Sequence, residues 1–404
     1  MKEQIPLGWA GIDVGKGHHW ICLIDETGTT VWSAKAVNDE AAILDAVSSV
    51  LARADEVVWG VDVTGTMSGL LLALLAAHGQ RVRYVPGRTV NQMSVAYRGE
   101  AKTDARDAYV IAETLRHRGD LQEVEVSTSL VTELRLLVTH RTDLVGDRVR
   151  MVNRLRDVLS GYFPALERSF DYAHSRGALT LLTGYQTPQA IRRTGASRLR
   201  AWLVKRKVRS ADQIAAAALV AAKAQQTVVP GQDVAASIVA DLATQLLAIG
   251  SRISELDARI TSTFRAHPQA EIIESLPGMG PILGAELIAA AGDLNGYANA
   301  GRLASAAGLV PVPRDSGRRT GNLHRPQRYS RKLRRVFYLS ASAAMMREGP
   351  NRDYYLKKRG QGHGHVQALI ALSRRRVDVL WALLRDNRLF EIAPPTREPM
   401  ARTA

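Results

Sequence analysis

The sequence is poor in cysteine, in long apolar runs and, over parts of its length, in acidic residues. The single cysteine, Cys22, excludes an internal disulfide and a zinc site built from cysteines. No run approaches the roughly 18 uninterrupted apolar residues of a membrane-spanning helix, and the N-terminus lacks the profile of a signal peptide. These absences predict a soluble, cytoplasmic protein with no membrane partner, in which Cys22 is a small buried residue.

The shortage of acids is local, and it leaves a strong positive charge. The 404 residues have a formal net charge of +15. Residues 1–125 contain 12 Lys and Arg against 17 Asp and Glu, whereas residues 314–376 contain 17 against 3. Residues 190–210 contain eight basic residues and no acid. A solvated helix face would explain one such run, but this charge favours a polyanionic partner, with nucleic acid ahead of a membrane.

The N-terminal part has the pattern of a mixed α/β sheet. Tight turns join the first three strands, which indicates hairpins, and a later apolar run is typical of a strand buried on both faces. The predicted strands cover residues 7–14, 19–25, 29–37, 56–63 and 81–86. Three helices are predicted: one begins near residue 38, and the other two cover residues 66–78 and 104–117. We therefore expect strands that pair first through hairpins and then through crossovers.

The middle of the chain changes to long helices with regular apolar seams. The first seam consists of Leu130, Leu134, Leu137, Val145, Val152, Leu155, Leu159 and Tyr162. The second consists of Val239, Leu242, Leu246, Ile249, Ile253, Leu256 and Ile260. The second seam alternates steps of three and four residues, which is the pattern of a coiled-coil face. It predicts either a helix pair within the chain or an oligomerisation stalk.

A glycine turn opens the C-terminal part. Gly278 and Gly280, in LPGMGP, precede a predicted helix that begins near Pro281. Such a turn presents free backbone N–H groups, which can bind a phosphate of DNA; an ordinary capped helix is the alternative interpretation. Residues after Leu389 are rich in proline and are expected to be disordered.

Four aspartates are the strongest candidates for a functional site. Asp13 and Asp62 lie near the ends of two predicted strands, in GIDVGK and GVDVTG. Asp104 and Asp107, in KTDARDA, are spaced i, i+3 and therefore share one face of a helix. Carboxylates gathered in this way are costly to bury without a cation. Oxygen ligands suit Mg²⁺ or Mn²⁺, and such ions assist phosphodiester displacement.

These motifs, in this order, resemble the DEDD transposases of bacterial insertion sequences. GIDVGK, DVTG and KTDARDA resemble the RNase H-like (RuvC-like) catalytic domain of that family, although the second acid is usually Glu and is Asp62 here. The segment from LPGMGPILGAELIAAAGD to PRDSGRRTG resembles the family's C-terminal transposase domain. The resemblance implies a DNA-cleaving and DNA-joining recombinase.

The resemblance also implies a covalent mechanism. It assigns Ser316 as the nucleophile that attacks a DNA phosphate and holds the broken strand as an ester. A serine hydroxyl needs activation and a partner for the developing charge. The neighbouring Arg314, Arg318 and Arg319 have the chemistry to bind the scissile phosphate. Tyr329 and Ser330 are rival nucleophiles. Contacts with the nucleic-acid backbone are expected for Lys332, Arg334 and Arg335.

We thus predict four regions, whose functions follow from the resemblance. They are a RuvC-like catalytic domain (1–125), a helical coiled-coil region (126–270), a mostly α-helical transposase domain (271–390) and a disordered tail (391–404). The predicted partners are DNA, a structured guide RNA and further copies of the chain. The copies would form a dimer or tetramer with a composite active site. The assembly would be associated with the nucleoid.

Three other functions compete with this one. The first is a RuvC-like, metal-dependent nuclease or resolvase in which Ser316 has no covalent role. The second is an actin-like sugar kinase, because GIDVG also opens the phosphate loop of that fold; the basic C-terminal part and the KTDARDA pair argue against it. The third is a nucleic-acid binder without activity, which would leave the four aspartates without a purpose.

Overall fold

The computed structural model divides the chain into two compact units, Met1–Val126 and Ser127–Ala404. The predicted disordered tail lies outside the described residues except for its first two positions. The residues that the structure describes are 4–63, 66–95, 103–124, 128–292, 294–316 and 320–392.

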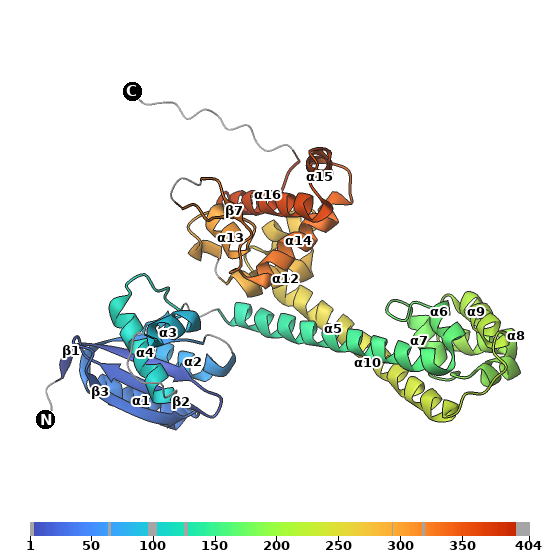
Figure 1. The fold of residues 1–404 in the computed structure, drawn as a ribbon, viewed down its shortest axis with the longest axis horizontal. Coiled ribbons are helices and arrows are strands. Elements are labelled where there is room, and N and C mark those ends of the chain that lie inside the picture. The colour runs from blue at the N-terminus through green and yellow to red at the C-terminus, as the bar shows by residue number, and fades with distance from the viewer. Residues whose placement is uncertain are drawn as a thin grey trace. The chain divides into compact units, whose positions relative to one another are not determined.

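A five-stranded mixed sheet forms the centre of the N-terminal unit (Figure 1). Its strand order is β3-β2-β1-β4-β5. The β1–β2 and β2–β3 pairs are antiparallel, whereas the β1–β4 and β4–β5 pairs are parallel. The strands are β1 (Ile5–Val14), β2 (His18–Ile24), β3 (Thr30–Val37), β4 (Ala54–Val61) and β5 (Val82–Tyr84). The order confirms the predicted mixed sheet and is consistent with an RNase H-like domain.

Helices cover both faces of this sheet. The first two pack on the face that carries Ile12, Leu23 and Trp59, and the fourth packs on the opposite face, which carries Cys22 and Ile24. Cys22 is buried, as predicted. The helices are α1 (Glu40–Leu51), α2 (Gly69–Ala77), α3 (Gly87–Ser94) and α4 (Asp104–His117), with the 3-10 turn η1 (Thr66–Ser68) before α2.

Two helices of 34 residues each, α5 (Ser129–Tyr162) and α10 (Gln232–Arg265), pack against each other in the second unit (Figure 1). At one end of the pair, apolar side chains pack with the short helices of the middle region to form the middle core. At the other end, they pack with the C-terminal helices to form the C-terminal core. The helices of the middle core are α6 (Pro164–Ser169), α7 (Arg176–Leu182), α8 (Pro188–Lys205) and α9 (Ala211–Lys223).

The second apolar seam therefore forms a helix pair within the chain. Val239 and Leu246 are buried in the middle core and Ile260 in the C-terminal core, whereas Ile253, between them, is only half-buried. By length and composition, α10 is the one described helix that could cross a membrane. Its buried apolar residues pack in the two protein cores instead. An oligomerisation stalk stays a prediction.

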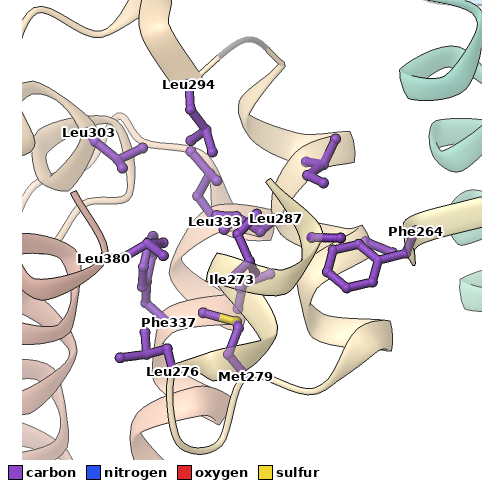
Figure 2. Close-up of a cluster of buried hydrophobic side chains, with 14 of the residues drawn as sticks. Phe264, Ile273, Leu276, Met279, Leu287, Leu294, Leu303, Leu333, Phe337 and Leu380 are labelled. Atoms are coloured by element: carbon purple, nitrogen blue, oxygen red, sulfur yellow. The ribbon is translucent and has the colours of Figure 1, made fainter. Parts of the chain in front are cut away.

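The C-terminal core includes two apolar residues of the glycine turn, Leu276 and Met279 (Figure 2). Figure 2 shows Leu276, Met279 and Phe337 gathered in this apolar cluster. Its elements are α11 (Ala270–Ser275), α12 (Pro281–Ala291), η2 (Leu294–Gly296), α13 (Ala300–Ala306), β6 (Val312–Pro313), β7 (Leu323–His324), α14 (Arg331–Met345), α15 (Pro350–Gly360) and α16 (His365–Arg385). The divisions predicted at residues 270 and 390 stay predictions.

Candidate active site

Two of the four aspartates lie at the same end of neighbouring parallel strands. The register pairs Ile12 of β1 with Val61 of β4, so Asp13 and Asp62 occupy the next position on each strand path. The carboxyl ends of parallel strands meet at one edge of a sheet, and this is the edge at which ligands bind in open α/β folds. Both side chains are half-buried.

The other two aspartates reach this edge on α4. The helix crosses β1 closely at Gly11, where a Cβ atom would collide with the backbone of Ala108 and Ala112. Thr103 caps the helix and accepts a hydrogen bond from the Arg106 backbone N–H. Asp104 and Asp107 therefore lie in the first turn, where the helix dipole stabilises negative charge.

The four carboxylates interact electrostatically. Burial, followed by the charges of Asp62, Asp107 and Asp104, raises the pKa of Asp13 to about 6. Burial also raises the pKa of Asp62, with a further contribution from Asp107, against the lowering effect of hydrogen bonds from backbone N–H groups. Like charges at one edge disfavour ionisation, and a cation among them would reverse that effect.

The four carboxylates offer oxygen ligands, which suit a hard cation. Oδ1 of Asp62 is buried and has no hydrogen-bond partner. Asp104 accepts a hydrogen bond of 2.9 Å from His18. Across the described parts of the chain, no group of three or more His, Cys, Asp or Glu side chains could hold a metal ion as it stands.

Ser316 lies on an exposed hairpin of the second unit. The hairpin is formed by β6 and β7, and Arg314 N–H donates to the Asn322 carbonyl oxygen at 2.9 Å. Asp315 closes the loop, because its Oδ1 accepts from Asn322 N–H at 2.9 Å. Ser316 and Arg314 are exposed. Asp315 and Asn322 have no signal in the sequence that marks this role. Arg318 and Arg319 lie outside the described residues.

The rival nucleophiles occupy structural positions. The Ser330 hydroxyl caps α14 by accepting a hydrogen bond from Leu333 N–H at 3.2 Å. The backbone N–H of Ser330 donates to the Ala306 carbonyl oxygen at 2.7 Å. The Tyr329 ring lies under the guanidinium of Arg334, 4.8 Å from its centroid. Both residues therefore have a structural role, and the assignment of Ser316 as the nucleophile stays a prediction.

Several predicted phosphate ligands are already engaged with protein groups. Arg335 forms an ion pair with Glu286 of α12, and Arg334 stacks on Tyr329. Lys332 is exposed. Arg376, which contributes to the basic charge of this region, is buried, and burial lowers its pKa to about 10. The charge of the sequence therefore overstates the charge available to a polyanion.

Arg376 supports the glycine turn from inside the core. Its Nη2 donates to the Pro277 carbonyl at 2.5 Å and to Ser340 Oγ at 2.6 Å. Gly278 has φ +80°, and a Cβ atom there would lie 2.6 Å from the Ser340 carbonyl oxygen. Gly280, at the N-cap of α12, has open space where a Cβ would be. The turn is thus fixed at one glycine and open at the other.

The basic run of the middle region is also only partly free. Arg192 donates to the backbone carbonyls of Ala222 and Gln225, and Arg200 pairs with Asp212. The basic corner, which we define as residues 205–209 between α8 and α9, is exposed at its charged positions. Within it, the Arg206 guanidinium stacks on the Trp202 ring at 3.6 Å.

Comparisons with known proteins agree along nearly the whole chain. A model of the IS110 DEDD transposases, described as a transposase, matches residues 10–164, and one described as the transposase of the IS116/IS110/IS902 family matches residues 270–356. The 44.8 kDa protein of insertion element IS116 from Streptomyces clavuligerus is 61% identical over 96% of this chain and 98% of its own length. The 42 kDa protein of IS900 from Mycobacterium paratuberculosis is 49% identical over 96% and 98%. The 43.6 kDa protein of IS110 from Streptomyces coelicolor is 33% identical over 97% of both chains.

Proposed function

The chain belongs to the IS116/IS110/IS902 family of transposases, which cleave and join DNA, and from this premise we propose that a cluster of four aspartates and a serine carry out its strand cleavage and exchange. The aspartates are Asp13, Asp62, Asp104 and Asp107, and the serine is Ser316. The proposal is supported by the paired strand positions that precede Asp13 and Asp62, by a buried oxygen of Asp62 that has no partner, and by the charges of Asp104 and Asp107 acting on Asp13.

DEDD transposases typically depend on a divalent metal, and we propose that the four aspartates hold Mg²⁺ or Mn²⁺. Both ions prefer oxygen ligands, and the cluster offers only carboxylate oxygens. When bound, such an ion stabilises the charge that develops on the oxygens of a phosphodiester during displacement. The side chain of Asp62 is one methylene shorter than that of the Glu usual in the family. Asp62 directly follows β4, so its backbone lies at the same sheet edge as Asp13, and the shorter side chain has less distance to span.

The proposed covalent step uses Ser316. Its Oγ forms a bond to the phosphorus of the scissile phosphodiester, and the bond from that phosphorus to one deoxyribose oxygen breaks. The serine loses one proton and the departing oxygen gains one. The number of phosphoester bonds stays constant, so a second strand can be joined in the reverse step without an energy-rich cofactor. Arg314 is placed beside the serine to bind the phosphate, as are Arg318 and Arg319 in the sequence.

We propose that the complete site forms between copies of the chain. The aspartates and Ser316 belong to different units. In a dimer or tetramer, the carboxylates of one copy would act with the serine of another, and the half-buried part of the α10 seam is a candidate contact. The basic corner and exposed basic residues of the C-terminal part, such as Arg314 and Lys332, would bind DNA and a structured guide RNA. The RNA would supply sequence specificity through base pairing. The protein would work in the cytoplasm at the nucleoid.

The test is a recombination assay with donor DNA, target DNA, Mg²⁺ and the RNA transcribed beside the gene. We expect joined products and a protein–DNA species that survives denaturing electrophoresis. Asp13→Ala should lower the rate about 100-fold or more, because the metal contributes several kcal/mol to the transition state. Ser316→Ala should abolish the covalent species.

Ser330→Ala is the matched control. Loss of this helix cap should cost about 1 kcal/mol of stability and leave the covalent species in place. Full cleavage by Ser316→Ala would instead favour a metal-dependent nuclease or resolvase that uses water. Full activity of Asp13→Ala would refute the acidic site.

A further inference from the structure

The turn between β1 and β2 brings a histidine to the rim of the acidic edge. Gly15 N–H donates to the His18 carbonyl oxygen at 3.1 Å, which closes the turn. Asn38 fastens the turn from the other side, because its Nδ2 donates to the Lys16 carbonyl and its N–H to the Gly17 carbonyl, both at 3.1 Å. The backbone of His18 is therefore held in place by hydrogen bonds on both sides.

The imidazole of His18 reaches across to the first turn of α4. Its Nε2 lies 2.9 Å from Oδ2 of Asp104, and the two side chains are 34% and 54% exposed. A carboxylate oxygen accepts this hydrogen bond from the imidazole tautomer that has its N–H at Nε2. This bond connects the sheet directly to one of the four carboxylates, and it occupies one of the two oxygens of that carboxylate.

We propose that His18 is a positioning residue of the metal site, which holds Oδ2 of Asp104 and leaves Oδ1 of the same carboxylate for the ion. The inference rests on the proposed metal-binding function of the four aspartates. A freely rotating carboxylate on an exposed helix turn must lose rotational freedom when it binds a metal, and a hydrogen bond already in place lowers that cost. Groups that orient metal ligands in this way typically change metal affinity 10–100-fold when they are removed.

Two other roles for the pair give different results. An ordinary exposed ion pair contributes about 0–1 kcal/mol to stability and has no effect on metal binding. A histidine that competed with the ion for Asp104 would weaken binding, and its removal would strengthen it. The direction of the change in metal affinity therefore separates the three roles.

The experiment titrates the full-length protein with Mn²⁺ at constant pH and measures free Mn²⁺ by electron paramagnetic resonance. We expect His18→Leu to bind Mn²⁺ about 10–100-fold more weakly than the wild type. His18→Gln, whose amide also donates, should stay within about threefold. The matched control is His174→Leu, because His174 forms a similar exposed pair with Asp171, at 2.7 Å, outside the N-terminal unit.

Unchanged or tighter Mn²⁺ binding by His18→Leu would overturn the inference while the metal site stands, as would equal losses in His18→Leu and His18→Gln. Absence of Mn²⁺ binding by the wild type, or equal binding by Asp13→Asn, would overturn the proposed metal site itself and the role of His18 with it. The melting temperatures of the metal-free variants should agree with that of the wild type within a few degrees, which excludes unfolding as the cause.

Discussion

Single residues in this protein have functions that depend on their immediate surroundings. Ser330 and Ser316 are both serines in a basic segment, yet one caps a helix and the other is exposed on a hairpin. The sequence distinguishes them only through the family resemblance, because a cap is defined by the start of its helix. The convergence of Asp13 and Asp62 was predictable, since both follow apolar runs typical of neighbouring strands. Arg376 was not, because nothing in its basic neighbourhood marks it as buried.

Asp13 should make the stability of the metal-free protein depend on pH. Its pKa is raised from 3.8 to about 6, so the folded state binds a proton more tightly than the unfolded state. Its contribution to stability is therefore present at low pH and is lost as the pH rises from about 3.8 to about 6.

The measurement compares wild type with Asp13→Asn in EDTA by urea unfolding, followed by tryptophan fluorescence. Four of the six tryptophans (Trp9, Trp20, Trp32 and Trp59) belong to the N-terminal unit. The free energy of unfolding of the wild type, relative to that of the variant, should fall between pH 4 and pH 7. Addition of Mg²⁺ at pH 7 should raise the free energy of unfolding of the wild type but not that of the variant. A constant difference across this range would contradict the prediction.

The two glycines of the LPGMG turn should respond differently to alanine. Gly278→Ala introduces a side chain at φ +80° and places its Cβ against the Ser340 carbonyl oxygen. We expect the stability of the C-terminal core to fall by about 1–3 kcal/mol. Gly280→Ala meets no atom and should change stability by less than about 0.5 kcal/mol. Urea unfolding, followed by circular dichroism, tests this; equal losses would show that the turn is not held as described.

Elements were predictable where their apolar pattern was long. The strands and α4 follow clear patterns, and the seams of α5 and α10 extend over about nine and about six turns. The eight residues of α3 give too short a pattern, with one buried position, Val90. A heptad alone could not distinguish a partner helix in the same chain from one in a second copy, because the same seam serves both.

The basic corner should contribute to nucleic-acid binding. Changing Lys205, Arg206 and Lys207 together to alanine should weaken binding to duplex DNA or to the RNA transcript. The slope of log K against log salt should fall by about 0.9 for each lost contact with a duplex-DNA phosphate. Fluorescence anisotropy at several salt concentrations measures both quantities.

The control removes three positive charges from arginines that already pair with carboxylates, which are Arg156, Arg259 and Arg265. Replacing these with glutamine lowers the net charge equally. Equal losses of affinity in the two triple variants would show that general charge, and not the corner, determines binding.

At the scale of the whole molecule, the two parts of the proposed site lie in two different compact units. The chain passes from the acidic edge to Ser316 through more than 200 residues, so no local pattern in the sequence specifies how they meet. The apolar faces of helices and strands are local properties and could be argued from residue spacing. Assembly depends on surfaces that complement one another across copies, and a single sequence contains no periodicity that reports this.

Mixing two inactive variants should restore activity if the site is composite. In a mixed dimer of the Asp13→Ala and Ser316→Ala variants, each site takes its aspartates from one chain and its serine from the other. One site therefore lacks both Asp13 and Ser316, and the other has intact aspartates and an intact serine. Random pairing should therefore recover roughly a quarter of the wild-type sites. The covalent protein–DNA species, measured after the variants are exchanged, counts these sites. Recovery would be absent if each chain used its own serine and aspartates.

The close crossing of α4 over β1 has a consequence for mutational tolerance. Gly11 has no functional group, yet any side chain there would push the helix away from the strand. The helix carries two of the four acids, so such a displacement would separate them from the other two while every acid remained in the sequence. In a screen of random substitutions, Gly11 should therefore behave like a catalytic position, with inactive variants that are still folded and still bind nucleic acid.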